Sequence, residues 1–124
     1  MCGIVGLFLK DKSLEPELGA MLTDMLVTMT DRGPDSAGIA IYGAGNDKMG
    51  KLTVQSDTPD ADFSDLDQDI KAATGTAVTI RTKSTHAVLE MDATAVATVR
   101  AALSDIRPSV RVMSAGDTIE IYKE

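Results

Sequence analysis

Apolar residues recur at helical spacing in several stretches of the chain. Between Glu17 and Asp31 they return every three or four positions, as in a helix with one buried stripe. Pro16 suits the first turn of this helix, and Gly33-Pro34 predicts its end, because proline cannot continue the hydrogen-bond ladder. Two further stripes predict later helices: Phe63, Leu66, Ile70 and Ala73, and then Val96, Val99, Leu103 and Ile106.

Short apolar or alternating runs predict the strands. Gly3 to Leu9 is continuous and rich in branched residues, which is typical of a strand buried on both faces. Further strands are expected at residues 36–42, 51–55, 77–82, 86–91, 110–114 and 118–122. The turn-rich residues 43–47 separate two patterns. We therefore expect one domain over residues 1–48 and a second over residues 49–124.

The second domain has the element order β-α-β-β-α-β, which is that of a ferredoxin-like split βαβ unit. The predicted fold class is α+β. The last strand, residues 118–122, either extends the sheet of this module or leads the chain back toward the first domain.

Composition narrows the possible partners and compartment. With 124 residues and a net charge of -7, the chain has no basic patch with which to bind nucleic acid. No apolar run is long enough to span a bilayer, and no signal peptide precedes the first run. We expect no membrane partner and a cytoplasmic location.

The residues needed for a metal or disulfide are scarce. Cys2 is the single cysteine and His86 the single histidine, so neither an internal disulfide nor structural zinc is expected. We predict no metal and no cofactor, and we place His86 on the surface of a strand. The acidic run around residues 60–69 lacks the glycine and final glutamate of a calcium loop, so we interpret it as an acidic helix face.

Cys2 combines two useful groups if Met1 is removed. Its thiol, with a usual pKa of about 8.5, needs a base, and the freed α-amine, with a usual pKa of about 7.7, supplies one. A single residue then provides nucleophile and base. A strand that begins at Gly3 would hold this residue in place.

Two motifs resemble those of class II glutamine amidotransferases, the N-terminal-nucleophile kind. Met1-Cys2-Gly3-Ile4-Val5-Gly6 is similar to the nucleophile segment of that family, and residues 31–38, Asp-Arg-Gly-Pro-Asp-Ser-Ala-Gly, resemble its second signature. The resemblance covers about the first 43 residues. It implies the first portion of an αββα sandwich, with the ferredoxin-like module as an insertion.

The resemblance also implies a reaction and a site. Cys2 would attack the side-chain amide of glutamine, release ammonia and leave a glutamyl thioester that water hydrolyses. Arg32 and Gly33 would line the glutamine pocket. The ammonia would pass to a synthase subunit, and a glutamate-synthase-like or methylglutamate-synthase-like partner is expected.

Other parts of that family's site are missing from this sequence. There is no Asn-Gly pair to form an oxyanion hole, and residues 81–86 have the types of a carboxylate-binding segment in the wrong order, so we interpret them as a solvated turn. A second chain, or a longer one, would have to complete the fold. Two alternatives remain: a non-catalytic regulatory or assembly module that binds a small ligand or partner subunit, and an unrelated α+β domain that matches both motifs by chance.

Overall fold

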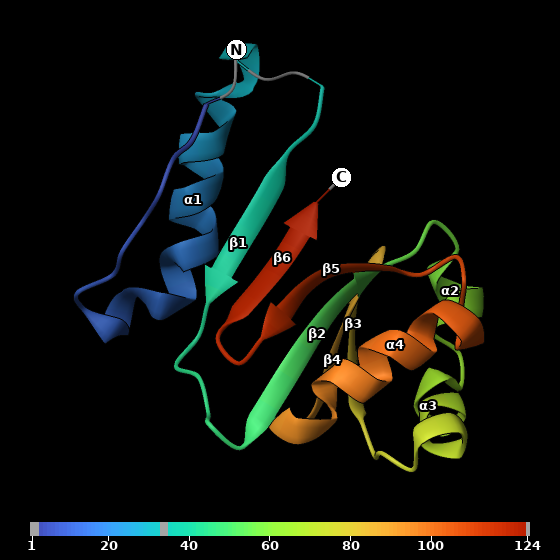
Figure 1. Cartoon of the computed structure of the whole chain (residues 1–124). Coiled ribbons are helices and arrows are strands. Elements are labelled where there is room, and N and C mark those ends of the chain that lie inside the picture. The colour runs from blue at the N-terminus through green and yellow to red at the C-terminus, as the bar shows by residue number, and fades with distance from the viewer. Residues whose placement is uncertain (1–2, 33–34, 124) are drawn as a thin grey trace. The chain divides into compact units, whose positions relative to one another are not determined.

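The computed structural model describes residues 3–32 and 35–123 (Figure 1). By their internal contacts they divide into two compact units, residues 1–37 and residues 38–123. Helices and antiparallel strands are both present, which confirms the α+β class. The division expected from sequence, residues 1–48 and 49–124, stays a prediction, because compactness does not show which segment is inserted into which.

The described part of the first unit contains one α-helix. A 3-10 helix, Lys12–Glu17, leads into α1, Leu18–Val27, and a short 3-10 turn, Thr30–Arg32, follows. Asp11 caps the first of these by accepting a hydrogen bond from the Ser13 backbone N–H at 2.9 Å. The helix predicted between Glu17 and Asp31 is therefore confirmed, but its predicted end at Arg32-Gly33-Pro34 is wrong, because α1 ends at Val27 and the chain continues in a 3-10 turn; Gly33 and Pro34 lie outside the described residues.

The predicted strand over residues 3–9 is wrong in this structure. These residues have no strand conformation, and Ile4 and Phe8 are 94% and 84% exposed. The physical reason is that a strand exists only with a neighbour to accept its backbone hydrogen bonds. No other strand lies within the described part of residues 1–37. A β-branched-rich run therefore stays irregular.

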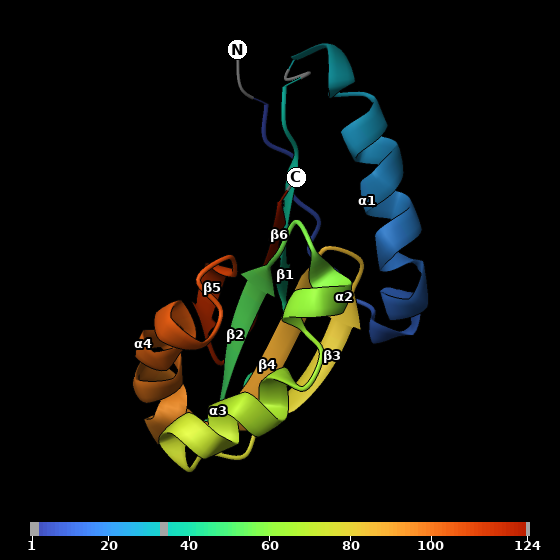
Figure 2. The same ribbon diagram turned by 90° about the vertical axis from the view of Figure 1, so that its right-hand side faces the viewer.

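The second unit contains a four-stranded antiparallel sheet with helices on one face (Figure 2). Its strands are β2 (Met49–Gln55), β3 (Thr79–Lys83), β4 (His86–Asp92) and β5 (Arg111–Gly116). The helices are α2 (Pro59–Asp62), α3 (Leu66–Thr74) and α4 (Val96–Ile106). The 3-10 turn Ala93–Ala95 precedes α4, and Asp92 caps it.

The strand order β3-β4-β2-β5 confirms the split βαβ arrangement. Strand β4 is antiparallel to both β2 and β3, so it lies between two strands that are parallel to each other. Helices α2 and α3 connect β2 to β3, and α4 connects β4 to β5. This is the ferredoxin-like order expected from the sequence.

The core lies between this sheet and its helices. Leu52 and Val54 of β2 pair in register with Leu89 and Ala87 of β4, and all four side chains are fully buried. The helices contribute Phe63, Leu66, Ile70, Val99 and Leu103. Gly50 lets α4 approach β2, because a Cβ added there would overlap the Val96 side chain.

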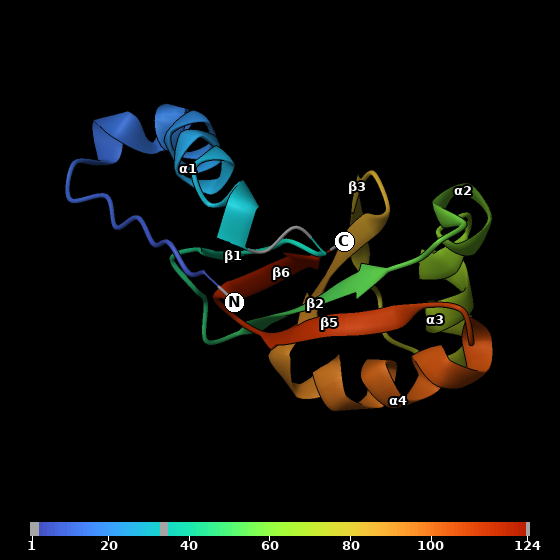
Figure 3. The same ribbon diagram turned by 90° about the horizontal axis from the view of Figure 1, so that it is seen from above.

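The last strand joins the N-terminal side of this unit. Strand β6, Ile119–Lys123, pairs antiparallel with β1, Gly38–Tyr42. Of the two outcomes expected for the final arm, the structure selects the return of the chain, since β6 pairs in register with β1 and adds no strand to either edge of the four-stranded sheet. Figure 3 shows α4 on one side of β2 and β5, and β6 on the other.

Candidate functional site

The predicted site residues are only partly within the described structure. Cys2 and Gly33 lie outside the described residues. Arg32 ends the 3-10 turn Thr30–Arg32 and is exposed. Its backbone N–H donates to the Met29 carbonyl at 2.9 Å, so this turn fixes the backbone of Arg32 relative to Met29.

The segment that follows Cys2 lies against this turn. A Cβ added to Gly3 would overlap the terminal methyl of Met29 and would lie 3.7 Å from both the Met29 sulfur and the Arg32 Cβ. The structure therefore brings a residue of the first motif, Gly3, beside a residue of the second motif, Arg32. Sequence reasoning placed Met29 in the helix stripe and missed this contact. The sequence feature that could have indicated this contact is the glycine at position 3, because glycine allows another group to approach the backbone closely.

A second group of polar residues lies on the sheet face opposite α4. Glu120 accepts hydrogen bonds from Lys51 at 2.9 Å, Arg81 at 3.0 Å and the Tyr122 hydroxyl at 2.7 Å. Burial alone would raise the pKa of the Glu120 carboxyl, but these donors lower it from 4.5 to about 2. Burial first, and then Glu120, raise the pKa of Tyr122 to about 12. This group fastens β6 to the sheet.

His86 belongs to the same face, and its predicted place on a strand surface is wrong. The residue is 3% exposed. Its Nδ1 lies 3.0 Å from the Thr85 hydroxyl, its Nε2 accepts the Lys123 backbone N–H at 3.1 Å, and its ring packs against Tyr122. The sequence prediction considered only the hairpin of β3 and β4, in which His86 would be exposed, whereas β6 covers His86 in the structure. Arg81 likewise belongs to β3 and pairs with Glu120, so residues 81–86 are not a wholly solvated turn.

Asp62 is the centre of a third polar group. The Ser56, Thr58 and Ser109 hydroxyls all donate to its carboxylate. These bonds, with Ser56 the largest contribution and Ser109 next, lower the pKa of Asp62. Because the carboxylate holds the loop after β2 against the loop before β5, we assign this group a structural role.

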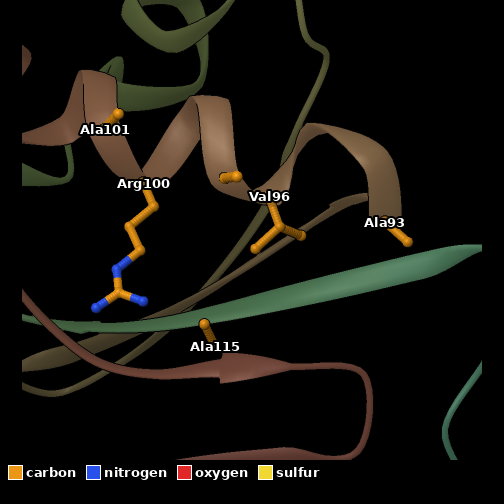
Figure 4. Close-up of a pocket in the computed structure, with 6 residues that line it drawn as sticks. Ala93, Val96, Arg100, Ala101 and Ala115 are labelled. Atoms are coloured by element: carbon orange, nitrogen blue, oxygen red, sulfur yellow. The ribbon is translucent and has the colours of Figure 1, made fainter.

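Two shallow hollows of the second unit lie beside α4, and Figure 4 shows the larger of the two. One of about 540 Å³ is lined mostly by alanine, with Arg100 as its one charged side chain. Its neighbour of about 380 Å³ shares Ala93, Val96 and Ala115 with it. Neither is lined by a cysteine, serine or histidine, and the smaller one has Asp47 and Asp117 as its charged residues.

Two negative findings apply to residues 3–32 and 35–123. No group of three or more histidine, cysteine, aspartate or glutamate side chains is placed to hold a metal ion within those ranges. None of the helices in the same part of the chain is both long and apolar enough to cross a bilayer.

Comparisons with known proteins point toward one family. The chain is 59% identical over all 124 residues to the glutamine amidotransferase-like protein GlxB of Rhizobium meliloti, and it spans 41% of that protein's length. Over 43 residues it is 56% identical to a putative glutamine amidotransferase of Methanothermobacter thermautotrophicus, of which this match covers 14%. No protein-family model and no solved structure matches.

Both relatives carry the name of glutamine amidotransferases, and the likeness to the first extends over the whole chain. These likenesses support a relationship to glutamine amidotransferases.

Proposed function

We propose that this chain carries the nucleophile segment of a class II glutamine amidotransferase. Cys2, freed of Met1, is the nucleophile, and glutamine is the substrate. The observation that carries the proposal is the contact of Gly3 with the Met29–Arg32 turn, which puts the residue next to Cys2 in the sequence beside Arg32. The names of both relatives support it.

The proposed reaction has two steps. The Cys2 thiol passes its proton to its own α-amine, and the thiolate attacks the side-chain carbonyl carbon of glutamine. The carbon–nitrogen bond then breaks, the α-ammonium returns the proton to the departing nitrogen, and ammonia leaves a glutamyl thioester. Water hydrolyses the thioester to glutamate and restores the thiol.

Arg32 and Gly33 are proposed to line the glutamine pocket. Arg32 is exposed and forms no ion pair among residues 3–32 and 35–123, so its guanidinium is available to a carboxylate, which it can bind through two parallel hydrogen bonds. The missing oxyanion donors must come from elsewhere, because the sequence has no Asn-Gly pair. We propose that the rest of a longer protein or a partner subunit supplies them and that a synthase receives the ammonia.

The test is intact-mass spectrometry before and after treatment with 6-diazo-5-oxo-norleucine, a glutamine mimic that alkylates such nucleophiles. We expect loss of Met1 and one adduct, absent from Cys2→Ala. Arg32→Ala should slow labelling about tenfold or more by loss of a charge-assisted bond, and Arg32→Lys should restore only part of the rate.

A simple thiol reagent is the control for access to the cysteine. Labelling of Cys2 by iodoacetamide but not by the glutamine mimic would refute the catalytic role of this chain. That result would favour the non-catalytic alternative, for which the specific observation is that the ferredoxin-like module has its own hydrophobic core. Retention of Met1 would also refute the catalytic role of Cys2, because its α-amine, the proposed base, would then be part of a peptide bond.

A further inference from the structure

The terminal methyl of Met29 occupies the space that a side chain at Gly3 would need. Of the atoms nearest to that position, two belong to Met29 and the third is the Arg32 Cβ. In this arrangement a residue other than glycine would place its Cβ on the methyl, which is the end of a flexible side chain and would have to move aside. Gly3 and Met29 are therefore complementary in volume.

The backbone of Met29 is fixed from both sides. Its N–H donates to the Leu26 carbonyl at 2.9 Å, and its carbonyl accepts the Arg32 N–H at 2.9 Å. Its side chain is half-buried, and the residue lies between the end of α1 and the turn that carries Arg32. A shift of Met29 would move Arg32 with it.

We propose that Met29 is a positioning residue for the nucleophile: its thioether packs on Gly3 and sets the distance between the Cys2 segment and Arg32. This rests on the proposed function, since it assigns the contact a role in that reaction. The flexible thioether fills an irregular space well. A displacement of about 1 Å at a reacting group can cost about 100-fold in rate, so a contact one residue from the nucleophile matters.

The experiment is a double-mutant cycle on the full chain with Gly3→Ala, Met29→Ala and both together. The rate of alkylation by 6-diazo-5-oxo-norleucine is separated into the saturating rate and the half-saturating concentration. We expect Gly3→Ala to lower the saturating rate about three- to tenfold, less than the roughly 100-fold cost of a full 1 Å displacement, because the flexible methyl absorbs part of the overlap. Adding Met29→Ala should restore part of that loss, because it removes the methyl that the new Cβ meets.

Matched variants separate positioning from general packing. Met25→Ala removes an equal side chain one turn earlier in the same half-buried stripe and should change the saturating rate little. Met29→Leu keeps most of the volume and should behave nearly as the original chain. Alkylation by iodoacetamide, which needs no glutamine pocket, should be similar in all variants.

The outcomes distinguish the two proposals. If the original chain is alkylated by the glutamine mimic but the Gly3 and Met29 effects simply multiply, the positioning role is wrong and the proposed function stands. Equal effects of Met25→Ala and Met29→Ala on the saturating rate would also overturn the positioning role of Met29 and leave the proposed function standing. If the original chain is not alkylated at all, the proposed function fails. Coupling seen only in the free energy of unfolding would then leave Met29 a packing residue and overturn its positioning role.

Discussion

Replacing Glu120 by glutamine should weaken the attachment of β6 in a pH-dependent way. The carboxylate holds Lys51, Arg81 and the Tyr122 hydroxyl, and its side chain is 10% exposed. Glutamine keeps the shape but removes the charge. The two ion pairs are lost, and Lys51 and Arg81 can only donate, so neither can accept a hydrogen bond from the amide nitrogen.

The magnitude follows from the pKa of Glu120. Folding lowers it from 4.5 to about 2, so the carboxylate stabilises the fold above pH 4.5, and this contribution is lost as the pH falls toward 2. Each pH unit corresponds to about 1.4 kcal/mol, which gives a ceiling of about 3 kcal/mol. Arg81 is 45% exposed, so solvent screens part of this, and we expect about 2 kcal/mol.

Urea unfolding followed by circular dichroism measures the effect. The original chain and Glu120→Gln should differ by about 2 kcal/mol near pH 7 and should converge as the pH approaches 2. Glu90→Gln is the matched control, because Glu90 is 34% exposed and has one longer ion pair, to Arg81 at 3.3 Å. It should cost less than about 0.5 kcal/mol. A difference that stays constant with pH, or one equal to that of the control, would refute the reasoning.

Two further substitutions in β2 have opposite expected signs. The Thr53 hydroxyl is fully buried and has no hydrogen-bond partner among the described residues, so Thr53→Val should stabilise the fold by about 1 kcal/mol in urea unfolding. An unchanged or lower stability would show that the hydroxyl has a partner. Gly50→Ala should destabilise by about 1–3 kcal/mol, because its Cβ would overlap Val96 and lie 3.3 Å from the Ala93 Cα. Val96→Ala in the same chain should recover part of that loss, and additive effects would contradict the steric explanation.

Most of the ferredoxin-like module could be predicted from the sequence. Apolar residues at helical spacing predict helices, and alternating apolar residues predict strands. The observed helices α3 and α4 and strands β2 to β5 lie where those patterns predicted them. The observed arrangement buries these apolar stripes in one core, and its strand order is that of the split βαβ motif which the element order predicted.

The candidate site was predictable only as a set of residues. Two short motifs named Cys2, Arg32 and Gly33, because their residue types carry the chemistry. The motifs could not identify Met29, because its contact with Gly3 joins positions 26 residues apart. The helical pattern of apolar residues does not distinguish Met29 from the other methionines in it. The sequence also failed to predict the conformation of residues 3–9, because their strand propensity forms no strand without a neighbouring strand to pair with.

The sequence by itself determined the helices, most strands, the α+β class and the chemistry-bearing residues, because these depend on local periodicity and residue type. Tertiary structure alone decided that β6 returns to β1, that Glu120 gathers Lys51 and Arg81, and that His86 is buried. The reason is that burial and charge pairing depend on which distant segment covers a face. That choice is made by the whole chain, since each contact must offset the entropy of ordering both segments.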